Sequence, residues 1–206
     1  MFFSNNTALG DGCRFRCGGI EWARAFFAHI LCSRVLCLVI LLSTGVSATA
    51  WADVGKAGEY QVKAAFIMNF MNFIEWPDNA LPADTITIGI LGRDPSAGAI
   101  DALKGKTVKG RQVIIRHYDD PEEARNAALL FISPSEKRAL PLIFKNLRNR
   151  PVLTVGDQQG FARAGVMINM VLVRKKVGFE INLPASHRAG IRISSQLLKL
   201  AKEVVE

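Results

Sequence analysis

Between residues 85 and 155 the chain repeats one pattern, in which a short apolar run is followed by a polar stretch that opens like a helix. The apolar runs are 85–91, 113–115, 128–132 and 151–155. Short runs that are rich in β-branched residues, or wholly apolar, are typical of strands inside a sheet. Strands that alternate with helices favour a mainly parallel sheet with helices on both faces, because each crossover lays a helix on the sheet.

The stretches between these runs predict helices. A short helix is expected over 96–103 and a longer one over 133–148. The acidic segment 119–123 predicts another helix start, because carboxylates near a helix N-terminus interact favourably with the helix dipole and Pro121 fits the first turn. Helix capping explains these clustered carboxylates better than a catalytic acid/base pair does.

Residues 58–76 precede the repeating pattern and predict the longest helix. Phe66, Phe70 and Phe73 recur at helical spacing, and aliphatic and Met residues widen the apolar face. Pro77 is expected to end the helix, because its ring disfavours helical geometry at the preceding residue. A stripe of this breadth indicates core packing rather than a cofactor pocket.

The end of the chain departs from the pattern. Residues 166–173 and 177–183 flank the basic turn 174–176, which predicts an antiparallel hairpin. A final helix is expected to begin at Ser194 or Ser195. Its residues expected to face the core are Leu197, Leu198, Ala201, Val204 and Val205. The predicted fold class is a single three-layer α/β domain, with a mainly parallel sheet, a C-terminal antiparallel hairpin and helices on both faces.

The N-terminal segment indicates export. Eight apolar residues at 35–42 follow a basic start and precede a small-residue stretch with Ala-x-Ala sites, which is the arrangement of a secretory signal peptide. Length argues against a membrane anchor, since spanning the hydrocarbon core takes about 20 apolar residues. Cleavage is expected after Ala50 or Ala52. The predicted organisation is a removed signal peptide with an N-terminal extension over 1–52, and a periplasmic α/β domain over 53–206.

Cysteine content and charge narrow the chemistry further. All four cysteines lie in the segment predicted to be removed, so the exported domain is expected to contain no thiol and no disulfide. The formal net charge of the chain is +8, and its basic residues are scattered, with the densest runs at 104–111 and 174–176. Both runs lie at predicted turns, so solvated turns explain them better than a binding patch. Nucleic acid is not expected as a partner outside the cytoplasm.

Recognisable catalytic and cofactor motifs are missing from the sequence. It contains neither a Gly-rich phosphate-binding loop nor a Gly-x-Ser-x-Gly nucleophile elbow. His117 and His187 lie in unrelated contexts, which indicates surface residues, since a metal centre needs several ligands at short spacing. We therefore expect no cofactor, no metal and no enzymatic activity; an undetected enzyme would have to be revealed by a turnover screen.

One polar constellation suggests a site near the predicted hairpin. Strand alternation places Glu180 and Asn182 on one face, Asn169 lies on the partner strand, and Arg192 follows between two isoleucines. Two interpretations stay open. Glu180 and Arg192 could form a structural ion pair that fixes the last helix to the hairpin, because an unpaired buried charge is costly. Alternatively, the four residues could line a ligand pocket in which Arg192 forks onto a carboxylate.

A set of short motifs follows one order along the chain. They are 60–66 (YQVKAAF), 69–70 (NF), 73–77 (FIEWP), 151–155 (PVLTV), 160–161 (GF), 167–169 (MIN), 179–182 (FEIN) and 190–198 (GIRISSQLL). Each motif alone is unspecific. As an ordered set, which covers nearly all of 53–206, they resemble the YfiR family.

The resemblance implies a sheet flanked by helices, often in a homodimer, and a non-enzymatic periplasmic regulator. It implies that the chain binds the periplasmic sensor region of an inner-membrane diguanylate cyclase, YfiN, and represses its synthesis of cyclic di-GMP. Cyclic di-GMP promotes biofilm formation, so such a repressor limits it. The best-known member has cysteine bridges that 53–206 lacks, so redox control is not implied here. The alternative is a small-molecule-binding sensory module that acts with another membrane receptor, such as a histidine kinase. Partner contact is expected at exposed apolar residues near the first helix or the hairpin.

Overall fold

The computed structural model describes residues 50–206. Within this range, residues 51–206 form one compact unit. The predicted signal-peptide core at 35–42 and the four cysteines lie outside the described residues, and cleavage after Ala50 or Ala52 stays a prediction. The helices of the described range are all too short or too polar to cross a membrane.

The longest helix, α2, runs over Ala50–Asn72 and carries the predicted apolar stripe. Ile67, Phe70 and Met71 are fully buried in the core. The ring of Phe70 also packs edge-on against Phe179 of the hairpin, with 5.0 Å between ring centroids. The stripe is therefore core, as predicted.

Helix α2 ends before the predicted boundary at residue 76. The chain turns at Phe73, whose N–H donates to the carbonyl of Phe70, and Ile74–Glu75 then form strand β1. β1 pairs antiparallel with β9 (Arg192–Ile193) in a separate two-stranded sheet. Pairing with this distant strand gives the residues before Pro77 an extended conformation, which a following proline also favours.

The main sheet has eight strands, in the order β10-β8-β7-β6-β5-β2-β4-β3. They are β2 (Thr85–Leu91), β3 (Thr107–Val108), β4 (Arg111–Tyr118), β5 (Leu129–Ile132), β6 (Leu153–Gly156), β7 (Ile168–Val173), β8 (Lys176–Asn182) and β10 (Glu203–Val205). Strands β4, β2, β5, β6 and β7 are parallel, whereas β7 and β8 form the predicted antiparallel hairpin. β3 adds an antiparallel edge strand beside β4, and β10 a parallel one beside β8.

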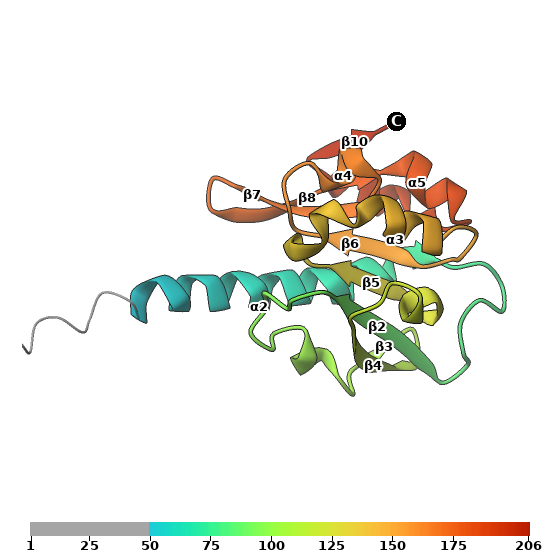
Figure 1. Cartoon of the computed structure of the whole chain (residues 1–206), viewed down its shortest axis with the longest axis horizontal. Coiled ribbons are helices and arrows are strands. Elements are labelled where there is room, and N and C mark those ends of the chain that lie inside the picture. The colour runs from blue at the N-terminus through green and yellow to red at the C-terminus, as the bar shows by residue number, and fades with distance from the viewer. Residues whose placement is uncertain (1–49) are drawn as a thin grey trace, which may run out of the picture. The chain divides into compact units, whose positions relative to one another are not determined.

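Helices cover both faces of the main sheet, as Figure 1 shows. The shorter helices are α3 (Leu140–Asn146), α4 (Phe161–Ala164), α5 (Leu183–Arg188) and α6 (Ser195–Leu200). Alternate residues of β5 divide the core: Leu129 and Phe131 pack in the cluster that contains α2, α5 and α6, whereas Leu130 and Ile132 pack with α3 and α4. The predicted three-layer α/β class is therefore confirmed.

Two of the predicted helices are reduced to short 3-10 segments. In place of a helix over 96–103 the structure has η1 (Asp101–Leu103), because the chain leaves helical geometry at Ala97, which has a φ of 49°. The helix expected from 119–123 is only η2 (Glu123–Asn126), since the chain enters β5 shortly afterwards. The helix expected over 133–148 is present in two pieces, η3 (Pro134–Arg138) and α3.

The predicted final helix is also too long. Leu197 is buried as expected, but α6 ends at Leu200. Val204 and Val205 lie in β10 instead, where Val204 is the register partner of Ile181. The edge of β8 presents backbone donors and acceptors, and strand pairing satisfies them, whereas a continued helix would not.

Candidate functional site

Two of the four predicted site residues face each other on the hairpin. Asn169 and Glu180 are register partners, and Asn169 Nδ2 donates a hydrogen bond to Glu180 Oε2 at 3.2 Å. On its other side Glu180 is the register partner of Glu203, so the three residues form a polar row across β7, β8 and β10. The side-chain oxygen of Asn169 is buried and has no hydrogen-bond partner in the described part of the chain.

The polar row reaches helix α4 through Arg163. Arg163 Nη2 donates to Glu203 Oε1 at 3.0 Å. This hydrogen bond raises the pKa of Arg163, and the charge of Glu180 contributes less to the same shift. Glu180 and the free oxygen of Asn169 are acceptors, so the row could accept hydrogen bonds from N–H or O–H groups of a ligand.

The side chain of Asn182 has a structural role, because both of its polar atoms form hydrogen bonds within the fold. Its buried Oδ1 accepts a hydrogen bond from the backbone N–H of Ala185 at 2.8 Å, which caps α5. Its Nδ2 donates to the carbonyl of Ala162 at 2.7 Å. Both ends of the amide are therefore engaged, and Asn182 ties α5 to α4.

Arg192 lies in the two-stranded sheet, where its partner is Glu75 rather than Glu180. Arg192 Nε is 3.3 Å from Glu75 Oε2, and the two side chains are 82% and 63% exposed. The predicted Glu180–Arg192 ion pair is therefore wrong. The reason is the pairing of β9 with β1, which sets Arg192 beside Glu75 at the surface.

Sequence reasoning missed a buried ionic cluster that attaches α2 to the end of β6. Asp157 directly follows β6, and its Oδ2 accepts hydrogen bonds from Tyr60 Oη at 2.7 Å and from Lys63 Nζ at 2.9 Å. Lys63 also forms an ion pair with Glu59 one turn earlier in the helix. The side chains of Lys63 and Asp157 are 5% and 1% exposed. We call Glu59, Tyr60, Lys63 and Asp157 the anchor cluster.

Burial is the largest influence on the pKa of Tyr60 in the anchor cluster. It raises the pKa of the Tyr60 hydroxyl, and the hydrogen bond to Asp157 raises it further, so Tyr60 stays neutral. One signal in the sequence could have revealed the cluster. Lys63 occupies the same helical face as Ile67 and Phe70, so a lysine stands where the apolar stripe predicts burial.

A groove with an apolar centre separates α2 from the hairpin. Val62 of α2 and Leu172 of β7 both line it and are 45% and 54% exposed. Its lining also carries Lys175 of the hairpin turn, Lys176 at the start of β8 and Glu59 of α2, and its volume is about 610 Å³. Figure 1 shows the hairpin extending over the N-terminal half of α2. We call this the helix–hairpin groove.

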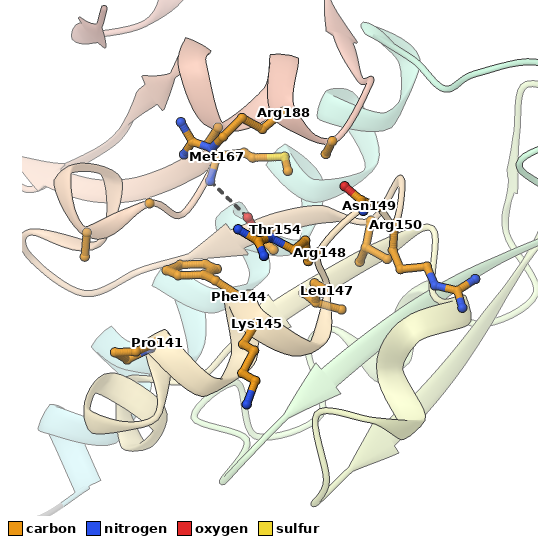
Figure 2. Close-up of a pocket in the computed structure, with 15 residues that line it drawn as sticks. Pro141, Phe144, Lys145, Leu147, Arg148, Asn149, Arg150, Thr154, Met167 and Arg188 are labelled. Atoms are coloured by element: carbon orange, nitrogen blue, oxygen red, sulfur yellow. Dashed lines mark hydrogen bonds between the residues drawn. The ribbon is translucent and has the colours of Figure 1, made fainter.

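A second groove lies between α3, the start of β6 and α5, with a volume of about 670 Å³ (Figure 2). Its cationic residues are Lys145, Arg148, Arg150 and Arg188. Its floor is apolar and includes Phe144 and Met167. We call it the basic groove. Neither groove is lined by the four residues that the sequence nominated.

The two histidines of the predicted domain are exposed, as expected. His117 Nε2 lies 2.9 Å from Asp101 Oδ1, and both side chains are about half exposed. Within residues 50–206, no three His, Cys, Asp or Glu side chains gather closely enough to hold a metal ion.

A comparison with protein families matches residues 60–202 to the family described as YfiR/HmsC-like. The chain belongs to the YfiR/HmsC-like family. The matched range begins in the anchor cluster and ends just before β10, so the resemblance seen in the sequence motifs is confirmed. Membership makes this chain a relative of periplasmic regulators of diguanylate cyclases, which act in regulation rather than in catalysis.

Two solved structures are similar to this chain. A conserved domain protein of Vibrio cholerae has a TM-score of 0.52 and 10% sequence identity, over 70% of this chain and 60% of that chain. The ABC domain of Streptococcus pneumoniae, solved in complex with L-Trp, has a TM-score of 0.43 and 12% identity, over 61% and 57%. This chain therefore spans less than two thirds of the length of either protein. The first similarity shows the fold alone, and the second supports no argument.

Proposed function

We propose that this chain is a periplasmic repressor that binds the periplasmic sensor region of an inner-membrane diguanylate cyclase of the YfiN kind. The observation that carries the proposal is the family match over 60–202. The predicted signal peptide supports it, because export would bring the chain to the side of the membrane where such a sensor region lies. Repression requires the chain to bind the inactive arrangement of the sensor more tightly than the active one. A homodimer is a further prediction, which the mass of the purified protein in solution tests.

We infer that the sensor contacts the helix–hairpin groove. Val62 and Leu172 are large exposed apolar residues on two walls of the same groove. Protein interfaces combine an apolar centre with a polar rim, and here Lys175 and Lys176 supply two cations, while the one carboxylate of the lining, Glu59, is paired with Lys63. The surface therefore suits a partner that offers an apolar anchor residue flanked by acidic residues. This location agrees with the contact expected from the sequence.

The test is cellular cyclic di-GMP in strains that carry single substitutions. Deletion of the gene is expected to raise cyclic di-GMP, and Leu172→Asp or Val62→Asp should raise it to the same level, because a carboxylate in the groove opposes apolar docking. Leu200→Asp is the matched control, since Leu200 is 67% exposed on α6 and does not line the groove. Deletion without any change in cyclic di-GMP would refute the repressor.

A small-molecule site at the polar row is a second proposal. It is favoured by one observation, the buried Asn169 oxygen that lacks a hydrogen-bond partner among the described residues, beside the half-buried carboxylate of Glu180. Of the other two residues first proposed for this pocket, Asn182 caps α5 and Arg192 pairs with Glu75. A thermal-shift screen with small primary amines and amides tests it. Stabilisation that Glu180→Gln abolishes supports the site, and equal stabilisation of both proteins rejects it.

A further inference from the structure

The basic groove brings together four basic side chains that form no ion pair within residues 50–206. Arg148, Arg150, Arg188 and Lys145 are all exposed, and none of their side chains forms an ion pair or hydrogen bond with another described residue. Three other arginines have carboxylate partners, namely Arg125 with Glu122, Arg163 with Glu203 and Arg192 with Glu75, whereas the remaining exposed arginines without one are scattered over separate elements. The lining of the groove includes no acidic residue.

Helix termini explain only part of this charge. Lys145 lies in the last turn of α3 and Arg188 in the last turn of α5, where cations interact favourably with the helix dipole. Arg148 and Arg150 lie beyond α3, on a turn in which Asn149 has a φ of 60°. That turn brings two more cations to the mouth of the groove, so mutual repulsion increases unless an anion binds there.

Two of the four cationic side chains are placed to bind an anion in the groove. In Figure 2 the guanidinium group of Arg148 lies near Thr154 and that of Arg188 near Met167, whereas Lys145 and Arg150 point away from both. A guanidinium can donate two parallel hydrogen bonds to the oxygens of a phosphate or carboxylate. Two of them on one groove therefore suit an oxyanion that carries more than one charge.

The floor of the groove suits an apolar body. The ring of Phe144 packs against the backbone at Gly165, where a Cβ would lie 3.0 Å from the ring and φ is 117°. Glycine therefore allows Phe144 to lie flat along the floor, beside the buried side chain of Met167. The volume of about 670 Å³ is within the range of small-molecule sites.

From these contacts we propose that the basic groove binds a small molecule with a phosphate group on a flat apolar body. Arg148 and Arg188 hold the phosphate, Lys145 and Arg150 attract it by charge, and Phe144 packs against the apolar part. The site goes beyond the proposed function, because it shares no lining residue with the helix–hairpin groove. A concave site suits a free small molecule better than a flat lipid surface, although a lipid headgroup carries the same phosphate.

The experiment measures binding by calorimetry with phenyl phosphate as the probe, on the purified chain and its variants. We expect saturable binding that weakens as salt is added, since the contacts are exposed charges. Arg148→Gln and Arg188→Gln should each weaken it about tenfold, which is the loss expected for one hydrogen bond between charged groups. Arg116→Gln is the matched control, because Arg116 is an exposed arginine on β4 outside the groove, and it should leave binding unchanged. Unchanged thermal melts verify that each variant folds.

Two further probes separate the parts of the proposal. Inorganic phosphate should bind at least about tenfold more weakly than phenyl phosphate if the floor contributes about 1.4 kcal/mol. Equal affinity would reject the apolar body. Vesicles that contain phosphatidylglycerol should bind no better than neutral vesicles, and binding to them without binding of phenyl phosphate would assign the groove to a membrane surface instead. Absence of saturable binding at millimolar probe, or equal weakening by Arg116→Gln and Arg148→Gln, would overturn the site.

Discussion

Lys63 and Asp157 form a buried ion pair, with Nζ 2.9 Å from Oδ2, although 94 residues separate them in the sequence. The pair attaches the longest helix to the end of strand β6, near the middle of the sheet. Asp157 Oδ1 is buried without a hydrogen-bond partner in the described part of the chain, so the charge of this carboxylate is compensated on one side only. Such a pair contributes little when intact and is costly to break, because one charge is then left in a poor environment.

Asp157→Ala is expected to lower the free energy of unfolding by about 3 kcal/mol, since it leaves the ammonium group of Lys63 buried. The loss should fall at the lower end of the range for broken buried pairs, because Glu59 still pairs with Lys63. Urea unfolding at neutral pH measures it. The double variant Lys63→Met/Asp157→Leu should recover most of the stability. A single variant as stable as the natural chain would show that the pair is not buried.

The chain should lose stability as pH rises above about 10, because burial and Asp157 raise the pKa of Tyr60. In the unfolded chain Tyr60 ionises near its ordinary pKa, whereas in the folded chain it stays protonated. The unfolded state then binds fewer protons than the folded state, so the free energy of unfolding falls with increasing pH. Thermal melts between pH 8 and about 11 test this. Tyr60→Phe should flatten the alkaline decline, although Tyr118, whose pKa burial also raises, should preserve part of it.

Asn182→Ala is expected to cost about 2 kcal/mol of stability. The substitution removes the cap of α5 and leaves the carbonyl of Ala162 without its donor. Asn182→Ser is the matched comparison, because a serine oxygen can still cap the helix, and it should lose about half as much. Urea unfolding of both variants gives the difference. Equal stability of all three proteins would mean that Asn182 has no structural role and is available to a ligand.

Replacement of Arg174-Lys175 by Asn-Gly should raise stability by about 1 kcal/mol. The two residues form the whole loop between β7 and β8, with φ values of 49° and 65°. Asn and Gly adopt these left-handed angles with less strain than Arg and Lys do. A thermal melt should therefore shift upward by a few degrees. Lys176→Gly is the control: it places glycine in a strand, so it should destabilise the hairpin.

The four polar residues that the sequence suggested as a site show which parts of a site a sequence pattern can predict. Strand alternation separates Phe179 and Ile181, which the structure buries in the core, from Glu180, and the hairpin pairs Glu180 with Asn169 of the partner strand. It cannot assign Arg192 a partner, because that depends on β9 pairing with β1, which is more than a hundred residues earlier in the chain. The basic groove was missed for a related reason, since its cations come from the ends of two helices that are distant in sequence.

The amino-acid sequence by itself determined the positions of β2, β4, β5, β6 and the β7–β8 hairpin, the parallel order that alternation with helices implies, and the buried face of the first helix. These properties depend on periodicity and turn residues within short windows, so neighbours along the chain are sufficient to specify them. Only the tertiary structure decided where the first and last helices stop, which carboxylate faces Lys63, and where cations gather around an apolar floor. Each of these depends on surfaces that come into contact only after folding. The backbone groups of an open strand edge and a buried charge both need partners, and these partners are distant in the sequence.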